Sequence, residues 1–214
     1  MPADSPGSPK KALLATLREQ AQARGILTPD AGLSADRVFS LVRDMDYQRA
    51  SSREPEATIK EWRGTCSGKH YLLKALFEEI GYQVKLVMCP HWFTDENTGG
   101  FPDDLKALLA GGPVPDVHTF LMIDTGESWT QVDATWPLWA GPLGLTVNQR
   151  FQPGVDMELA CEPEEFLEVP AGEDPQKFKE RLIKSFCGSN SSTRERFIQE
   201  MANWLTRQAP APDP

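Results

Sequence analysis

The sequence lacks the features that mark membrane proteins, secreted proteins and nucleic-acid-binding proteins. No stretch approaches the roughly 18 apolar residues of a membrane span, and the N-terminus MPADSPGSPKK has no apolar core like that of a signal peptide. The formal net charge is -9 and there is no basic run, whereas nucleic acids and anionic membrane surfaces are held by clustered Lys and Arg. We therefore expect a cytoplasmic protein with no membrane or nucleic-acid partner.

Two further absences concern cofactors and cysteine pairs. No glycine-rich phosphate loop follows a strand pattern, so we expect no nucleotide cofactor. The chain has only 4 cysteines, Cys66, Cys89, Cys161 and Cys187, and none of them forms a CxxC pair. In the cytosol such cysteines are free thiols, metal ligands or catalytic groups more often than disulfides. Cys161 and Cys187 are most simply packing residues or surface thiols.

The composition is that of a globular protein of one domain. Hydrophobic residues make up 40% and charged residues 25% of 214 residues, which is enough to build a substantial core. Both ends are rich in proline and hold almost nothing to bury, which is typical of disorder. We expect disordered tails at residues 1–9 and 208–214, and a single domain over residues 10–207.

The pattern of apolar residues predicts an α+β fold. Apolar spacing typical of helices marks 10–24, 35–47 with Ser34 as its cap, 67–80 with Gly81 as its stop, and a C-terminal helix bearing Phe197, Met201, Trp204 and Leu205. Alternating patterns typical of strands mark 82–89, 118–124 and 129–135. Residues 48–62 look like a polar connection, and 91–104 like a long loop. This order indicates helices packed on an antiparallel sheet.

Cys66 occupies an unusual place in the stretch EWRGTCSGKHYLLKALFEEIGY. The apolar stripe of the helix predicted over 67–80 consists of Leu73, Leu76, Phe77 and Ile80, and Cys66 lies outside it, at the start of the helix. The N–H groups at the start of a helix lower the pKa of a thiol and favour the reactive thiolate. Cys66 is therefore a candidate nucleophile.

The hairpin predicted over 118–135 places a histidine near a carboxylate. If Thr125 to Ser128 form the turn, Phe120 lies opposite Asp133 and His118 opposite Thr135. His118 and Asp133 then project from the same face as diagonal neighbours, roughly 7 to 8 Å apart at the backbone. A slip of one residue in the pairing would put them on opposite faces.

Cysteine, histidine and aspartate complement one another in nucleophilic catalysis. A histidine beside the thiol stabilises the thiolate and later gives a proton to the leaving group. The carboxylate orients the imidazole and stabilises its charged form. We therefore predict a catalytic triad of Cys66, His118 and Asp133, with backbone N–H groups near Cys66 as oxyanion donors.

Two motifs resemble those of the transglutaminase-like superfamily. The segment RGTCSGKHYLLKALFEEIGYQVKLV is similar to its nucleophile helix and following strand, and HTFLMIDTGESWTQVDATW to its histidine and aspartate hairpin. The resemblance covers residues 55–137 and departs from the usual pattern at Phe120, in place of Trp, and at Ala134, in place of Pro. It implies a papain-like fold in which Cys66 is the nucleophile, His118 the base and Asp133 the orienting carboxylate.

The implied activity is acyl transfer through a thioester. We expect a thiol enzyme that hydrolyses or transfers the acyl group of an amide, in a peptide or a small molecule, with no metal. Aromatic residues near the triad in sequence, Trp62, Trp92, Phe93 and Trp136, are the candidates for substrate binding. For Trp136 an ordinary place in the core is an equal alternative.

Three alternatives remain open from the sequence. His70 lies one helical turn from Cys66 and could serve as its partner, but no carboxylate is evident for it, which favours a role at the surface or in capping. Cys66, His70, Cys89 and His91 offer four zinc ligand types, although their spacing matches no strong zinc motif. The chain could also be a binding or scaffold module that retains the fold without catalysis. The oligomeric state is open.

Overall fold

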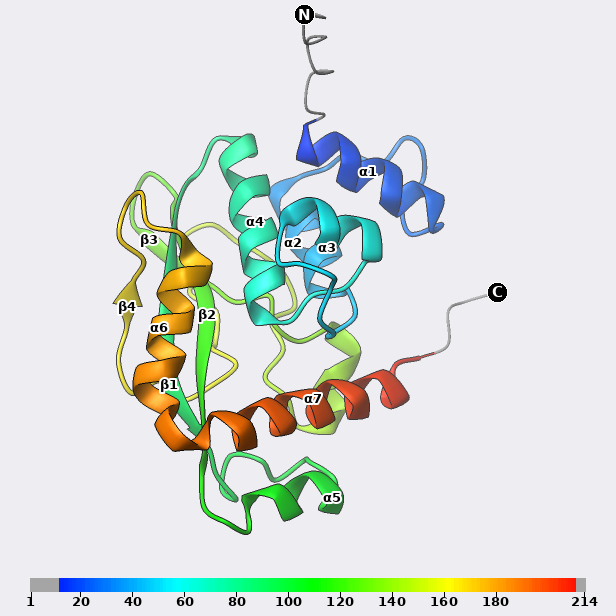
Figure 1. Ribbon diagram of the computed structural model, residues 1–214. Helices are drawn as coiled ribbons and strands as arrows, with labels where there is room; N and C mark the ends of the chain where they lie inside the picture. The colour runs from blue at the N-terminus through cyan, green and yellow to red at the C-terminus, as the bar shows by residue number, and fades with distance from the viewer. Residues whose placement is uncertain (1–11, 211–214) are drawn as a thin grey trace, which may run out of the picture.

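The computed structural model describes residues 12–210, and this part of the chain forms seven α-helices and one four-stranded antiparallel sheet (Figure 1). The α+β class expected from the sequence is confirmed. The tail expected at 1–9 and residues 211–214 of the expected C-terminal tail lie outside the described residues. No helix within 12–210 is long and apolar enough to span a membrane.

The N-terminal half consists of four helices: α1 (Leu13–Ala23), α2 (Ala35–Arg43), α3 (Pro55–Glu61) and α4 (Cys66–Ile80). As predicted, the Ser34 side chain caps α2, by accepting the N–H of Arg37 at 3.2 Å. Helix α3 lies within the segment expected to be a polar connection, so that expectation is wrong. Its start is favoured by Pro55, because proline at the first helical position has no N–H left unpaired.

The sheet has the strand order β3-β2-β1-β4, formed by β1 (Gln83–Phe93), β2 (Val114–Asp124), β3 (Trp129–Val132) and β4 (Leu167–Glu168). The β1–β2 ladder runs without a break from Gln83 opposite Asp124 to Phe93 opposite Val114. Both strands are longer than the predicted 82–89 and 118–124. Pro90 and Pro115 each lie beyond the short β4 or β3, where the missing N–H breaks no strand ladder, and the Pro90 carbonyl accepts the Glu164 N–H at 2.9 Å.

The predicted hairpin has the expected register. Asp124 pairs with Trp129 and Met122 with Gln131, and the Thr125 N–H donates to the Ser128 carbonyl at 3.1 Å to close the turn. Strand β3 ends at Val132, earlier than predicted, so Asp133 lies just past the end of the ladder.

The remaining elements are α5 (Asp103–Lys106), α6 (Pro175–Cys187), α7 (Ser191–Gln208), and three short 3-10 helices, η1 (Ala107–Leu109), η2 (Leu138–Leu143) and η3 (Gly188–Asn190). Helix α6 was not predicted from the sequence. It lies alongside β1 and β2, and α7 crosses their lower end (Figure 1). The stripe predicted for the C-terminal helix is confirmed, since its four apolar residues are buried in α7.

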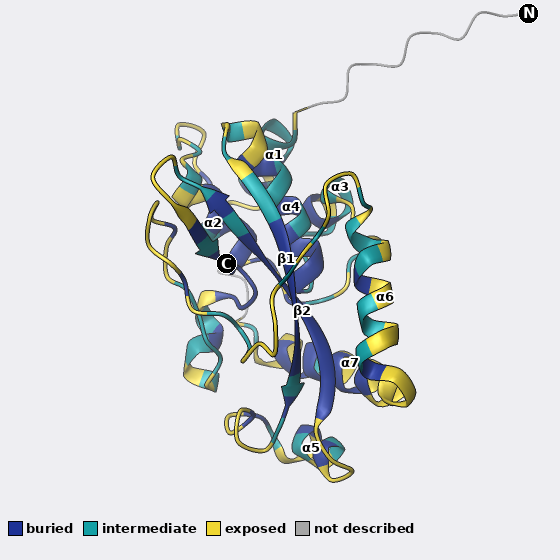
Figure 2. Cartoon of the chain, turned by 90° about the vertical axis from the view of Figure 1, so that its left-hand side faces the viewer, coloured by how far each residue is buried: buried dark blue, intermediate teal, exposed yellow. Residues whose placement is uncertain are grey.

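Two hydrophobic clusters support the fold. In the first, Leu72, Leu76 and Phe77 of α4 pack against Leu86 and Leu121 of the sheet. In the second, α7 packs against aromatic residues at the end of β1 and in the following loop. β1 and β2 are buried over most of their length, whereas exposed residues gather on the outer side of α6 (Figure 2).

The loop after β1 is held against η2 by a close contact between backbones. A Cβ atom added to Gly100 would lie 2.0 Å from the Leu143 carbonyl oxygen, so only glycine fits there. Phe101, next along the loop, is buried and its ring centroid lies 5.3 Å from that of Trp204. The loop, which the sequence predicted as a long loop over 91–104, is therefore packed on the domain.

Candidate active site

Cys66 is the first residue of α4. Strand β3 ends at Val132 and leaves the rest of that edge of β2 unpaired, and the start of α4 lies there. The Ser67 hydroxyl lies 3.4 Å from the hydroxyl of Thr119 on β2. On its other side, the first turn of α4 contacts the segment after β3 through His70. This position brings the thiol beside His118, which projects from the same unpaired part of β2.

His118 and Asp133 form a buried ion pair. His118 Nε2 lies 2.8 Å from Asp133 Oδ2, a contact that the predicted hairpin register allows. Burial by itself lowers the pKa of His118, but the carboxylate of Asp133 outweighs burial and holds that pKa well above its usual value. Because His118 Nε2 is hydrogen-bonded to Asp133, Nδ1 is the ring nitrogen that can hydrogen-bond to the Cys66 thiol.

Asp133 is further fixed by three hydrogen bonds from its own neighbourhood. Its carboxylate accepts the N–H of Thr135 at 2.9 Å, the Thr135 hydroxyl at 2.5 Å and the N–H of Ala160 at 2.8 Å. Burial raises the pKa of Asp133, but the charge of His118 and these bonds outweigh it and hold the pKa well below its usual range. Asp133 therefore stays ionised and orients the imidazole.

Two buried side chains from the first turn of α4 hold the segment around Asp133. His70 Nε2 accepts the N–H of Ala134 at 2.9 Å, so its Nδ1 carries the proton and donates to the Cys66 carbonyl at 2.7 Å. Lys69 Nζ donates to the Thr135 carbonyl at 3.1 Å and to the Arg43 carbonyl at 2.7 Å. The expectation that His70 serves at the surface is wrong, because its side chain is fully buried.

Lys179 is a member of the site that sequence reasoning missed. Its ammonium group lies 3.5 Å from Cys66 Sγ, 2.7 Å from the Ser67 hydroxyl and 3.1 Å from the Thr119 hydroxyl, and the residue is only 3% exposed. None of these three partners is a carboxylate, so the anionic group among them is the thiolate of Cys66. A signal was present in the sequence, because Lys179 shares one helix face with the apolar Ile183 and Phe186.

The surroundings of Cys66 favour the thiolate. Burial raises the pKa of the thiol, but the charge of Lys179, a hydrogen bond with His118 and the charge of His118 together lower it to about 6. The thiolate thus lies between two cationic groups. At neutral pH most of Cys66 is ionised.

Tyr47 lies at the start of α4 and contacts the backbone of the nucleophile. Its hydroxyl accepts a hydrogen bond from the Cys66 N–H, and its ring centroid lies 4.5 Å from that of Trp136. Burial, followed by the negative charges of Cys66 and Asp116, holds the pKa of Tyr47 well above its usual value. The phenol therefore keeps its proton and can donate it in a hydrogen bond.

A second buried ion pair anchors α7 beneath the site. Arg194 of α7 donates to Asp116 of β2 from Nε at 2.7 Å, and its Nη2 lies 2.6 Å from the same oxygen. His91 Nε2 lies 3.8 Å from the other carboxylate oxygen. Burial raises the pKa of Asp116, but Arg194 and His91 outweigh it and hold it well below its usual range.

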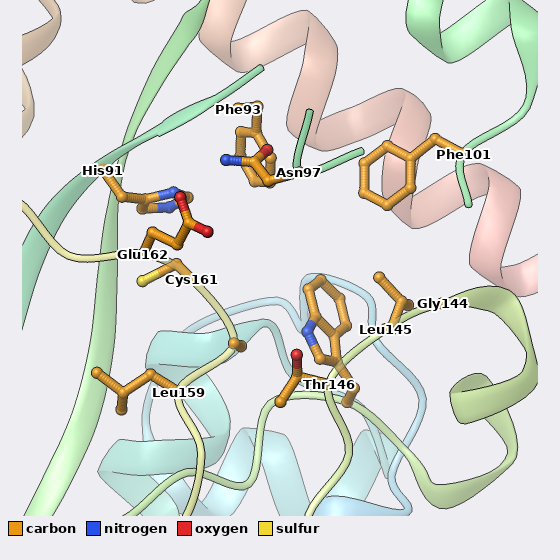
Figure 3. Close-up of a pocket in the computed structure, with 12 residues that line it drawn as sticks. His91, Phe93, Asn97, Phe101, Gly144, Leu145, Thr146, Leu159, Cys161 and Glu162 are labelled. Atoms are coloured by element: carbon orange, nitrogen blue, oxygen red, sulfur yellow. The ribbon is translucent and has the colours of Figure 1, made fainter. Parts of the chain in front are cut away.

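Figure 3 shows a cavity of about 160 Å³, and its lining residue Ala160 is bonded to Asp133 of the triad. His91 and Phe93 of β1 form one side and the segment Leu159–Glu162 faces them. Cys161 in this wall has its sulfur 3.6 Å from that of Cys89, and both are free thiols. Cys66 itself is 5% exposed and is not a lining residue.

The four aromatic residues proposed for substrate binding fall into two groups. Phe93 and Trp136 line this cavity. Trp62 lies at the end of α3 under the guanidinium of Arg24, whose carbon is 5.0 Å from the ring centroid. Trp92 packs against Phe186 of α6 outside the cavity, with the two ring centroids 4.9 Å apart and the rings tilted. Only the first pair is placed to contact a molecule in the cavity.

The four potential zinc ligands do not converge. Within residues 12–210, no three His, Cys, Asp or Glu side chains are grouped as a metal site requires. His70 uses both ring nitrogens in hydrogen bonds to the backbone.

No protein-family model matches the sequence, and no curated protein matches it significantly.

Proposed function

We propose that this protein is a cysteine-dependent enzyme with a transglutaminase-like, papain-like core that forms an acyl-enzyme at Cys66. The proposal rests on one arrangement, a thiol with a pKa of about 6 next to a histidine whose Nε2 is 2.8 Å from a buried carboxylate. Thiol, imidazole and carboxylate in this order constitute the machinery of acyl transfer. The substrate class is an amide, in a peptide or a small molecule.

In the first half-reaction the Cys66 thiolate attacks the carbonyl carbon and forms a C–S bond. The donor available to the oxygen that becomes negative is the Tyr47 hydroxyl, which keeps its proton and is positioned by the Cys66 N–H that it accepts. The C–N bond then breaks, and the His118 imidazolium gives its proton to the leaving amine. The product is a thioester with a neutral His118, still oriented by Asp133.

In the second half-reaction an acceptor attacks the thioester carbon. His118 takes a proton from the acceptor, the C–S bond breaks, and the Cys66 thiolate returns between its two cationic neighbours. Water as the acceptor makes the protein a hydrolase, and an amine makes it an acyltransferase.

The pH dependence of Cys66 alkylation by iodoacetamide tests this proposal. Followed by mass spectrometry, the native thiol should titrate at a pKa of about 6, and His118→Ala should raise that value. His118→Ala leaves the three local hydrogen bonds of Asp133 in place, so the fold should persist. A native thiol with a pKa near the ordinary value of about 8.5 would refute the proposal that Cys66 is a catalytic nucleophile.

A second candidate function is a binding or scaffold module, favoured by one observation, the 5% exposure of Cys66 and its absence from the cavity wall. An activated ester such as p-nitrophenyl acetate separates the two. An enzyme should release more than one equivalent of nitrophenol per protein, with acetyl-Cys66 as an intermediate. A binding module should react no faster than a small thiol of the same pKa.

A further inference from the structure

A second hollow, of about 200 Å³, lies on the N-terminal side of α4 and shares no lining residue with the cavity of Figure 3. Its walls are the loop 49–53, Thr58 of α3, and Gly64, Thr65 and Gly68 around the start of α4. Thr65 and Gly68 are the chain neighbours of Cys66 and Ser67 on either side, so the hollow lies at the same end of α4 as the nucleophile, although Cys66 does not line it. Helices α3 and α4 lie side by side here (Figure 1).

The start of α4 offers hydrogen-bond donors to this hollow. The first helical bond at this end runs from the Lys69 N–H to the Thr65 carbonyl, so the N–H groups of Ser67 and Gly68 precede the helical ladder. Thr65 makes no side-chain cap. Unpaired N–H groups and the helix dipole together favour an anion at such a position.

An independent observation at the same place is the hydroxyl of Thr58. The residue is fully buried, and its Oγ1 has no hydrogen-bond partner. It faces Gly68, where an added Cβ would lie 3.4 Å from Oγ1. Buried hydroxyls are nearly always paired, so an unpaired one in the wall of a hollow indicates a partner that is not part of this chain.

The loop supplies positive charge in excess, because Arg49, Arg53 and Arg194 all act on the single carboxylate of Glu195. Arg49 Nη2 donates to Glu195 Oε2 at 3.0 Å. The carboxylate of the nearby Glu61 accepts hydrogen bonds from Arg63 and from the Ser51 N–H. Arg53 is half-buried and, among the described residues, makes no hydrogen bond or ion pair.

We infer that this hollow binds a carboxylate of the substrate, which makes the substrate an amide that carries a carboxylate near the bond to be cleaved. The inference rests on the proposed function. The planar guanidinium of Arg53 matches a carboxylate with two parallel hydrogen bonds, and the Gly68 N–H and Thr58 hydroxyl complete the donor set. An uncharged substrate would leave all three groups unpaired.

A pair of alkylating reagents of the same shape and reactivity tests the carboxylate site. N-iodoacetylglycine carries a carboxylate and N-iodoacetylglycinamide carries an amide in its place, and the β-alanine homologues shift that group by one methylene. We expect the native protein to be alkylated at Cys66 faster by one of the acids than by its amide. In Arg53→Gln the acid-to-amide rate ratio should fall about tenfold, while the amide rate changes less than about twofold.

Two further variants sharpen the test. Arg196→Gln removes the same charge from an exposed position on α7, outside the hollow, and should leave the ratio unchanged. Thr58→Val should lower the ratio without lowering stability, because it replaces an unpaired buried hydroxyl by a methyl group.

The two proposals fail in different ways in this experiment. Equal ratios in the native protein and Arg53→Gln would overturn the carboxylate site, whatever the reactivity of the thiol. The pH profile of the amide reagent alone reports on the thiol, so a midpoint near the ordinary value would overturn the proposed function.

Discussion

Replacing Lys179 by methionine should raise the pKa of the Cys66 thiol by at least one unit. With an effective dielectric constant of about 20, Coulomb's law gives roughly 5 kcal/mol for opposite unit charges at the 3.5 Å between Nζ and Sγ. Since one pKa unit corresponds to about 1.4 kcal/mol, the upper limit of the change is roughly three units. We expect the pKa to rise from about 6 to about 8, within the range usual for one close charge.

The substitution is chosen so that little else changes. Methionine has nearly the length of lysine and fills the same space. The Ser67 and Thr119 hydroxyls lose their hydrogen bonds to the Lys179 ammonium in this variant. They lie 3.4 Å apart and can hydrogen-bond to each other instead. The folded structure should therefore persist, and the change in reactivity can be assigned to the lost charge.

The assay is the rate of Cys66 alkylation by iodoacetamide as a function of pH. At pH 7 the rate should fall about tenfold in Lys179→Met, because a pKa of about 8 leaves about a tenth of the thiol ionised. Lys184→Met, on the exposed side of the same helix, should behave like the native protein. A midpoint that stays at about 6 in Lys179→Met would refute the reasoning and leave His118 as the sole source of the low pKa.

Two other perturbations concern stability. Burial lowers the pKa of His70 to about 4, below the unfolded value of about 6.5. As the pH falls, the unfolded chain therefore binds a proton at His70 before the folded protein does. The contribution of neutral His70 to the free energy of unfolding is lost between about pH 6.5 and about pH 4. Between pH 7 and pH 5 the free energy of unfolding of the native protein, measured with urea, should drop by about 2 kcal/mol more than that of His70→Gln, and parallel curves would contradict this account. Gly100→Ala should lower the free energy of unfolding by about 1–3 kcal/mol, because its Cβ would lie 2.0 Å from a backbone oxygen. Gly99→Ala, with no atom within 4 Å, is the matched control in thermal unfolding, and equal melting temperatures for the two variants would count against the contact.

The parts of the site that sequence reasoning predicted are those set by local pattern. The apolar stripe of α4 and the stop at Gly81 fix the helix, so the position of Cys66 at its start follows. The turn at 125–128 fixes the register, and with it the face shared by His118 and Asp133. Neither step needs knowledge of distant contacts, because helix periodicity and hairpin pairing act over a few residues.

The missed parts depend on packing between distant segments. Lys179 meets Cys66 across 113 positions of sequence, and a lysine on a helix face is usually solvated. Tyr47 and Arg194 likewise reach the site only through the folding of α2 and α7 around the sheet. Helix α3 was missed because Pro55 and the polar residues before it suggest a loop, although proline is favoured at the first position of a helix.

The buried ammonium of Lys179 has a consequence for the course of the reaction that goes beyond the thiol pKa. In the free enzyme its charge is balanced by the thiolate at 3.5 Å, and its other two partners are neutral hydroxyls. When Cys66 carries an acyl group its sulfur is neutral, and the ammonium remains buried without that counter-charge, which is unfavourable. The thioester is thus destabilised relative to the thiolate, which favours transfer of the acyl group to its acceptor.

Lys179→Met should slow acylation but let more of the acetyl-enzyme accumulate during turnover of p-nitrophenyl acetate, as intact-protein mass spectrometry would measure. A smaller acetylated fraction than in the native protein would mean that Lys179 acts only on the thiolate.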